Sequence, residues 1–282
     1  MREQTTGMRG HTPGWYERLA RQQEGYYYPW ESTTAEGGGE AAYAELVRQH
    51  LTPERDVLEP GCGHGVDAVA FAPLCRTLRA YDQVDRFITL ARQAVADGGI
   101  DNTTFLCRSS SADRNGGRVT VPALTASIDV VISRRGPTNW IEDAPRFCRP
   151  GAVLIQLNPL GQLDEYAWNR QLPEDLRLHP PDADPDNGMR ERIETRLATV
   201  GLAIHSCWTC DVPEWLRGPR ELYRFLTFGQ SADEIPSWPE VEPELSDVFE
   251  RHAGELGLEL RNRCFLWKAV FEPETSPSMQ KL

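Results

Sequence analysis

Short apolar runs alternate with amphipathic segments through the middle of the chain. Apolar runs bounded by turn residues predict buried strands, and apolar residues that recur every three to four positions predict helices between them. The alternation therefore predicts an α/β fold, a doubly wound, mostly parallel seven-stranded sheet with helices on both faces. The strands are expected at residues 56–59, 77–81, 103–107, 128–133, 152–157, 202–211 and 259–271, and residues 118–121 alternate like a further edge strand.

The flanking segments divide the chain into three consecutive regions. Residues 1–50 are expected to form an N-terminal strap and a helix on the core, residues 51–160 the central sheet, and residues 161–282 an insertion and the completion of the same sheet. Within the third region, residues 172–188 and 232–245 are rich in proline and acidic residues, a composition that does not fill a core. Both are interpreted as inserted loops on the substrate side of the sheet.

Four aromatic residues crowd into residues 26–30, where Pro29 excludes a continuous helix. Two interpretations stay open. The segment packs on the core as a strap, or it covers a ligand pocket in which a ring such as that of Tyr28 attracts a positively charged group by cation–π interaction.

Three glycines follow the first strand. Glu59 ends an apolar run, Gly61, Gly63 and Gly65 come at every second position after it, and an amphipathic segment comes next. This order predicts a strand, a tight loop and a helix. Glycine lets the backbone take positive φ and lets a ligand approach without a Cβ in the way, while the helix N-terminus offers unpaired N–H groups. The loop is a predicted nucleotide-binding turn.

An acidic residue, Asp82, ends the next strand, about 20 positions beyond the glycines, where a carboxylate suits paired hydrogen bonds to two ribose hydroxyls. The spacing G-x-G-x-G, together with Asp82, resembles the first motifs of the class I S-adenosylmethionine (SAM)-dependent methyltransferases. Arg-Pro-Gly at residues 149–151 adds to the similarity. The resemblance covers residues 51–159 by motif and the rest by element order, and it implies SAM as cofactor and an antiparallel last strand.

The resemblance also implies which residues hold the cofactor, with His64 near its amino-acid end. Where the family usually carries an acidic residue facing the adenine amino group, this chain has Ser109 and Ser110, and Asp113 a little further along is an alternative. The predicted cofactor-binding residues are Tyr28, Glu59, Gly61, Cys62, Gly63, His64, Asp82, Gln83, Ser109, Ser110, Ser133 and Arg134.

The residues after the fourth strand are predicted to face the methyl acceptor, because open α/β sheets bind ligands at the carboxyl ends of their strands. Two adjacent arginines there are costly to bury unless they are solvated or paired, and the guanidinium fork matches a carboxylate or a phosphate. Internal pairing with Glu142 or Asp143 is one alternative; we favour at least one arginine facing an anionic group in the pocket. The predicted catalytic and acceptor-side residues are Arg134, Arg135, Asn139 and Trp140.

Composition limits the classes of partner that the protein is expected to bind. The formal net charge of −12 argues against a protein that holds nucleic acid by neutralising phosphates. A small, anionic or aromatic molecule is therefore the expected acceptor, with ribosomal RNA or protein as the alternative. Seven cysteines without a paired zinc pattern predict reduced thiols and no metal. No apolar run approaches the ~20 residues of a membrane helix, so a soluble, cytoplasmic protein without membrane contact is expected.

Two other classes compete with a methyltransferase that transfers the sulfonium methyl to an O, N or C atom. An NAD-linked oxidoreductase would require G-x-G-x-x-G and a proton donor such as a Tyr-x-x-x-Lys pair, and the chain offers neither in a suitable place. A non-catalytic SAM-binding module would keep the same cofactor motif. Calorimetry with SAM and NAD separates the first class from the other two, and a methyl-transfer assay separates the enzyme from the module.

Overall fold

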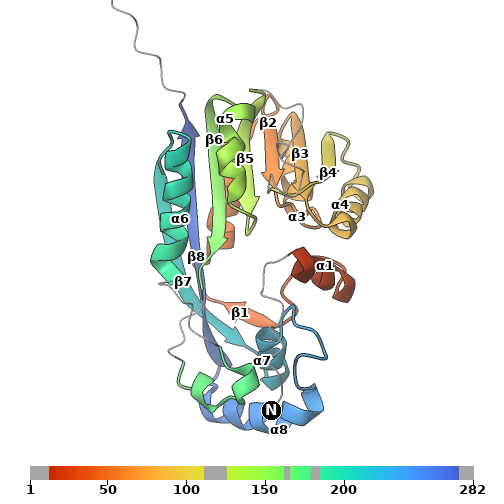
Figure 1. Ribbon diagram of the computed structural model, residues 1–282, viewed down its shortest axis with the longest axis vertical. Helices are drawn as coiled ribbons and strands as arrows, with labels where there is room; N and C mark the ends of the chain where they lie inside the picture. The colour runs from red at the N-terminus through yellow and green to blue at the C-terminus, as the bar shows by residue number, and fades with distance from the viewer. Residues whose placement is uncertain (1–12, 111–125, 162–165, 179–184, 273–282) are drawn as a thin grey trace, which may run out of the picture. The chain divides into compact units, whose positions relative to one another are not determined.

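The computed structural model describes residues 13–110, 126–161, 166–178 and 185–272. Its strands form one sheet in the order β1-β7-β8-β6-β5-β2-β3-β4 (Figure 1). The run β6-β5-β2-β3-β4 is parallel throughout, whereas β1 is antiparallel to β7. The strands are β1 (Ser32–Thr34), β2 (Asp56–Pro60), β3 (Thr77–Asp82), β4 (Thr103–Cys107), β5 (Ile128–Arg134), β6 (Cys148–Pro159), β7 (Ser206–Leu216) and β8 (Leu258–Phe271).

Helices separate most of these strands along the chain, as the apolar period predicts. Shorter 3₁₀ turns complete the connections. The α-helices are α1 (Pro13–Gln22), α2 (Gly39–Arg48), α3 (Val66–Phe71), α4 (Asp85–Asp97), α5 (Ala144–Phe147), α6 (Pro185–Thr199), α7 (Pro219–Leu226) and α8 (Trp238–His252).

Within the described residues the sheet has eight strands rather than the seven expected. All seven predicted strands are present, and β1 is the addition. Its three residues are too few to show an alternating pattern, and it is defined by its pairing with β7, Ser32 opposite Leu216 and Thr34 opposite Glu214. A further edge strand expected at residues 118–121 lies outside the described residues.

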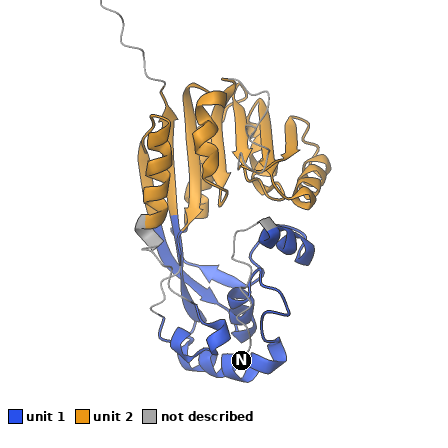
Figure 2. Ribbon diagram, viewed as in Figure 1, with its two compact units in different colours: residues 1–38, 160–186, 210–264 blue, residues 39–159, 187–209, 265–282 orange. Residues whose placement is uncertain are grey.

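Contacts between Cα atoms divide the chain into two compact units (Figure 2). Unit 1 comprises residues 1–38, 160–186 and 210–264, and unit 2 the remaining segments, 39–159, 187–209 and 265–282. Each unit is therefore built from segments that are far apart in sequence. The sequence analysis instead divided the chain into three consecutive regions.

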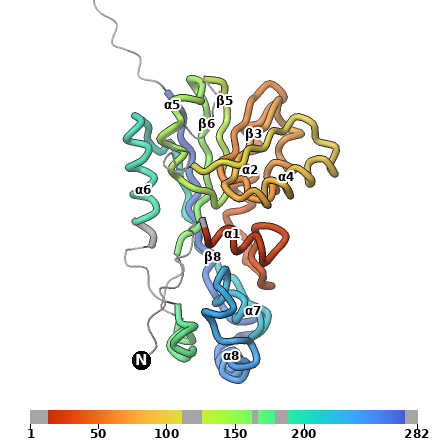
Figure 3. Tube along the Cα trace, turned by 45° about the vertical axis from the view of Figure 1, so that its right-hand side comes forward, coloured from red at the N-terminus to blue at the C-terminus, as the bar shows by residue number. Residues whose placement is uncertain are grey.

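In unit 2 the central strands are buried on both faces. All five residues of β2 are buried, as are Val130, Val131, Ile132 and Ser133 in β5. Since successive side chains of a strand point to opposite faces, unbroken burial means that helices cover both sides. In two views α4 and α6 lie at opposite sides of this unit (Figures 1 and 3).

Parallel pairing brings the functional ends of the strands together. Glu59 pairs with Ala80 and Pro60 with Tyr81, so the loop after β2 begins beside the last residue of β3, Asp82. β5 lies on the other side of β2. The glycine loop, Asp82 and the residues after β5 therefore share one edge of the sheet, as predicted.

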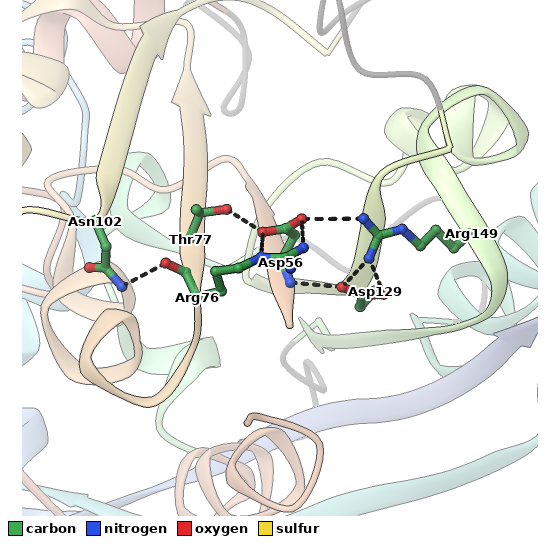
Figure 4. A network of polar contacts seen from close by, with 6 residues as sticks. All are labelled: Asp56, Arg76, Thr77, Asn102, Asp129 and Arg149. Carbon is green, nitrogen blue, oxygen red and sulfur yellow. Dashed lines mark hydrogen bonds and ion pairs between the residues drawn. The ribbon is translucent and has the colours of Figure 1, made fainter. Parts of the chain in front are cut away.

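A charged network joins the opposite, amino-terminal ends of the same strands (Figure 4). The Asp56 carboxylate accepts hydrogen bonds from Arg76 Nε at 3.0 Å and from Thr77 Oγ1 at 2.7 Å. Asp129 accepts the Asp56 backbone N–H at 2.8 Å and pairs with Arg149 at 2.7 Å. The hydrogen bonds from Arg76 are the main reason that the pKa of Asp56 lies below its usual value. The network ties β2, β3, β5 and β6 together in register.

Unit 1 has its own apolar core. It is built around the 3₁₀ turns after β6, the end of β7, α7, α8 and the start of β8. Its buried members are Trp168, Leu172, Leu176, Leu216, Leu222, Leu226, Val241, Leu245, Val248, Leu258 and Leu260.

Both segments predicted as substrate-side loops contribute buried residues to this core. Residues 232–245 were expected to form a loop, but α8 begins at Trp238. The Ser237 and Glu240 side chains form a capping box and a proline lies in the first turn, where it is tolerated. Acidic and proline residues here belong to the start and the solvent face of a helix, not to an inserted loop.

Residues 172–188 were likewise expected to form an inserted loop. Leu172 and Leu176 are 1% and 3% exposed and belong to the unit 1 core, and α6 already begins at Pro185. Residues 179–184 lie outside the described residues. The two leucines show that at least the first part of this segment packs rather than projecting into solvent.

All seven cysteines lie within the described ranges, and each is a free thiol. Cys207 and Cys210 are half-buried on β7. Among the described residues, no helix combines the length and the apolar character that crossing a membrane requires.

Candidate functional site

The glycine loop leaves β2 with its backbone fixed by β3. The N–H groups of Gly61 and Cys62 both donate to the Tyr81 carbonyl, at 2.8 and 3.1 Å. Gly61 has φ +71°, and a Cβ on it would lie 2.5 Å from Cδ of Pro137. Gly63 has φ +51°. Both positions therefore require glycine, one for close packing under the loop and one for the turn itself.

Asp82 holds the loop from the neighbouring strand. Its Oδ2 accepts the Gly63 N–H at 3.1 Å and its Oδ1 accepts the Val84 N–H at 2.9 Å. Burial raises the pKa of Asp82, and the hydrogen bonds from Val84, Gly63 and Gln83 oppose that shift. The side chain is partly exposed, so the carboxylate combines a fixed position with access to a ligand.

Glu59 is the buried acid at the base of the loop. It is 3% exposed, and its Oε2 atom has no hydrogen-bond partner among the described residues. Burial is the main cause that raises its pKa well above the usual value, the charge of Asp67 adds to the rise, and Arg134 opposes it. A buried carboxylate oxygen without a partner is costly, which marks this atom as a place for a ligand donor.

Arg134 crosses from the end of β5 to two acidic residues. Its Nε and terminal nitrogen bind Oδ1 of Asp67 at 3.0 and 2.8 Å, and its other terminal nitrogen donates to Glu40 at 2.8 Å. Tyr43 donates its hydroxyl to the second oxygen of Asp67 at 3.0 Å. Arg135, in the left-handed region at φ +60°, donates to the other oxygen of Glu40.

Arg134 and Arg135 do pair internally, but with Glu40 and Asp67, whereas Glu142 and Asp143 were the internal partners considered as the alternative to a ligand anion. Glu142 pairs with Arg196 of α6, and Asp143 pairs with Arg146 at 3.6 Å. Glu40 and Asp67 lie far from the arginines in sequence but reach them because α2 and α3 pack beside the carboxyl end of β5. No local pattern in the sequence indicates this pairing.

Trp140 is placed in the core rather than toward an acceptor. It is fully buried, and its ring stacks on Trp267 at a centroid distance of 6.2 Å. An acceptor has no open ring face there, which corrects the predicted role. Asn139 is partly exposed and its buried Oδ1 has no hydrogen-bond partner among the described residues, so its predicted role stays open.

Ser133 supports the loop from below. Its fully buried hydroxyl donates to the Pro60 carbonyl at 2.8 Å. A Cβ on Gly136 would lie 2.3 Å from this hydroxyl oxygen, so the turn after β5 packs directly on it. Gln156 donates to the carbonyls of Gly136 and Pro137 at 3.0 and 3.1 Å. Ser133 thus positions the start of the glycine loop, and contact of its side chain with the cofactor stays a prediction.

The predicted adenine-side residues follow β4. Ser110 donates to the Tyr81 hydroxyl at 3.2 Å, and Ser109 is partly exposed beside it. Asp113, the alternative, lies outside the described residues. Gln83 directly follows Asp82 and is partly exposed. These residues share the carboxyl edge of the sheet with the loop, while their contacts with a cofactor stay predictions.

The two side chains inside the glycine loop differ in exposure. Cys62 is buried, which raises the pKa of its thiol. His64 is half-buried; burial lowers its pKa, and the positive charge of Arg134 lowers it further. A neutral imidazole is therefore favoured beside the loop at neutral pH.

Tyr28 belongs to unit 1, whereas the glycine loop belongs to unit 2. Its ring stacks on Trp30 at 4.6 Å and meets Phe228 edge-on at 5.4 Å. Trp30 in turn meets Phe225 of α7 edge-on. The aromatic segment thus packs within unit 1, in keeping with the strap interpretation, and the cofactor contact of Tyr28 stays a prediction.

Three residues of the site were missed in the sequence. Glu40, Tyr43 and Asp67 complete the polar cluster around Arg134. One signal was available, because Asp67 falls in the first turn of the helix that follows the glycine loop, where a carboxylate faces the ligand side. No local pattern distinguishes Glu40 and Tyr43 from ordinary residues of an amphipathic helix.

Neither a protein-family model nor a curated protein sequence matches this chain. Solved structures do match. A functionally unknown protein from Deinococcus radiodurans R1 is 23% identical over 90% of this chain and 97% of its own, with a TM-score of 0.62. A putative methyltransferase from Bacillus halodurans C-125 is 16% identical over 83% and 100%, with a TM-score of 0.54. The [4+2]-cyclase SpnF is 14% identical over 92% of each chain, with a TM-score of 0.52.

These similarities establish the fold and not the reaction, since one of the similar proteins is a cyclase by its description. They agree with the mostly parallel α/β sheet of this chain. The chain has the fold of the class I SAM-dependent methyltransferases.

Proposed function

We propose that this protein is a SAM-dependent methyltransferase that transfers a methyl group to an O, N or C atom of a small molecule. The observation that carries the proposal is the buried Oε2 of Glu59, which has no hydrogen-bond partner in the described part of the chain and lies beneath a glycine loop that Asp82 holds from the next strand. SAM carries an ammonium group and ribose hydroxyls, and buried or fixed carboxylates are the groups that bind such donors.

The residues of the loop edge fit this cofactor. Glu59 would accept a hydrogen bond from its ammonium group, Asp82 would accept from the ribose, and Ser109 and Ser110 would lie toward the base. Gly61, Cys62, Gly63 and His64 supply the loop backbone along the cofactor, with Gln83 beside Asp82. When bound, SAM supplies an electrophilic methyl on a sulfonium. The protein's part is to hold donor and acceptor close and in line, which can account for a large share of the rate.

The acceptor side supports a small, anionic or aromatic molecule. Arg134 ends β5 and Arg135 follows it, next to the loop, and their side chains are 26% and 24% exposed. Asn139 lies on the same connection. The net charge of −12 disfavours a polyanion such as ribosomal RNA, and a protein acceptor is the other alternative.

Calorimetry with SAM and with NAD, followed by transfer of labelled methyl to cell-extract fractions separated by size, tests the proposal. We expect SAM to bind, NAD not to bind, and label to appear in the metabolite fraction. Label in RNA or protein would replace the small acceptor by a macromolecule. SAM binding without transfer to any fraction would favour a non-catalytic module, and NAD binding without SAM binding would overturn the cofactor assignment.

A further inference from the structure

One carboxylate bridges the two adjacent arginines at the carboxyl end of β5. Glu40 Oε2 accepts from Arg134 at 2.8 Å, while Glu40 Oε1 accepts from Arg135. Each oxygen of a single carboxylate therefore binds a different guanidinium. This is how a pair of arginines holds a carboxylate or a phosphate of a ligand.

The two acidic partners of Arg134 differ sharply in exposure. The side chain of Asp67 is 7% exposed, and it binds Arg134 through two nitrogens and Tyr43 through its other oxygen. The side chain of Glu40 is 41% exposed. A buried, fully bonded carboxylate is a lasting partner, whereas an exposed one regains hydration when it leaves and its ion pair contributes little net stability. Asp67 anchors Arg134, and Glu40 can exchange.

The backbone around Glu40 permits that exchange. Glu40 is the second residue of α2 and follows three glycines, of which Gly37 has φ +90°. The helix is held further along by Tyr43 and Val47, which are 1% and 0% exposed. The first turn of a helix opens more easily than its interior, and glycines before it impose little restriction on the backbone. Glu40 can therefore swing away while α2 stays packed.

We propose that Arg134 and Arg135 form the binding site for a carboxylate or phosphate group of the acceptor, and that Glu40 fills this site in the free protein until the acceptor displaces it. The identification of the ligand as the methyl acceptor rests on the proposed function, whereas the anion site itself does not. The displacement replaces one anion by another, so the charge balance of the buried Arg134–Asp67 pair is preserved. A neutral ligand would not compete with Glu40, and the site thereby selects anionic molecules.

Titration with inorganic phosphate and with benzoate, followed by calorimetry at low ionic strength, tests the proposal. Glu40→Gln keeps the shape of the side chain but presents an amide NH₂ to one guanidinium, so we expect it to bind at least one of the two probes about tenfold more tightly than the wild type. Glu45→Gln is the matched control, because Glu45 is exposed on the same helix. Within the described residues, its carboxylate accepts a hydrogen bond from the Gln49 side chain alone, at 3.2 Å. The control should change the affinity less than twofold.

A double variant, Glu40→Gln with Arg135→Met, should lose the gain, since the methionine has no guanidinium fork. The proposal is overturned if Glu40→Gln binds neither probe more tightly than Glu45→Gln does, or if the double variant keeps the gain. SAM affinity measured on the same samples keeps the two ideas apart. Absence of SAM binding in every variant would remove the methyltransferase proposal, while the phosphate and benzoate titrations would still decide whether Glu40 covers an anion site.

Discussion

The two ends of the parallel strands in unit 2 carry charged clusters of opposite character. At the amino ends, Asp56 accepts hydrogen bonds from Arg76 and Thr77 and Asp129 accepts them from Arg149, and the pKa of Asp56 is held below its usual value. At the carboxyl ends, Glu59 is buried with one oxygen unpartnered among the described residues, and its pKa is raised.

The difference teaches which cluster serves stability and which serves binding. A carboxylate whose hydrogen bonds are complete stabilises the folded chain. A buried carboxylate left incomplete lowers stability and is retained where a ligand completes it. The same strands thus combine a stabilising end with a binding end, and substitutions at matched positions should separate the two effects.

Gly63→Val should give the largest effect at the binding end. Gly63 has φ +51°, and valine is strongly disfavoured there. We expect SAM affinity to fall more than about 1,000-fold in calorimetry, because the loop backbone and the Asp82 hydrogen bond are both displaced. The matched control is Gly151→Val at the other end, where φ is +81° and no atom lies within 4 Å of the added Cβ. It should lose about 1–2 kcal/mol of stability and keep its SAM affinity.

Asp82→Ala should weaken SAM binding by about 2–4 kcal/mol through loss of charge-assisted hydrogen bonds. Asp85→Ala, at the exposed first residue of α4, is the control and should bind SAM normally. Unchanged affinity in the Asp82 variant, with a wild-type circular dichroism spectrum, would remove Asp82 from the cofactor site.

Asp56→Asn tests the stabilising end. The substitution removes a carboxylate that binds Arg76 at 3.0 Å and pairs with Arg149 at 3.5 Å. We expect the free energy of unfolding in urea to fall by about 2 kcal/mol at pH 7, with SAM affinity unchanged. The depressed pKa means that wild-type Asp56 contributes this stability above its unfolded pKa and loses it as the pH falls through the folded pKa. The difference between the proteins should therefore vanish in acid; a pH-independent difference would contradict the ion-pair explanation.

Glu59→Gln should give the smallest change in stability, and in the opposite direction. The raised pKa of Glu59 means that its favourable protonated form is fully present below the unfolded pKa and is lost as the pH rises through the folded pKa. The variant should therefore be more stable than the wild type by about 1 kcal/mol at pH 8 and equal to it near pH 4. It should also bind SAM more weakly. A variant less stable than the wild type at pH 8 would show that Glu59 is a structural residue like Asp56.

The sequence predicted most of the fold because its signals are local. Strand and helix periods are visible within ten residues, and seven strands lie close to their predicted positions. The segments that were misread are those in which local composition and tertiary context conflict. The prolines and acids before residue 245 indicated a loop, but Val241, Leu245 and Val248 supply an apolar stripe that α8 buries in unit 1.

The candidate site shows the same contrast between local signals and tertiary context. The glycine loop and Asp82 could be located from sequence, because backbone conformation and strand register depend on neighbouring residues. Their relation to Glu40, Asp67 and Trp140 could not. Arg134 meets Glu40 across 94 residues of chain and Asp67 across 67, and nothing in either segment specifies the other.

By itself, then, the sequence determined where the glycine loop and its acidic partner Asp82 lie on a parallel sheet. Only the tertiary structure decided that Trp140 lies in the core, that two arginines share the carboxylate of Glu40, and that one oxygen of Glu59 is without a partner among the described residues. The physical reason is that loop and strand conformations follow from short-range sterics and hydrogen bonds. Burial and ion pairing depend instead on which distant side chains the packing of α2 and α3 brings to the end of β5.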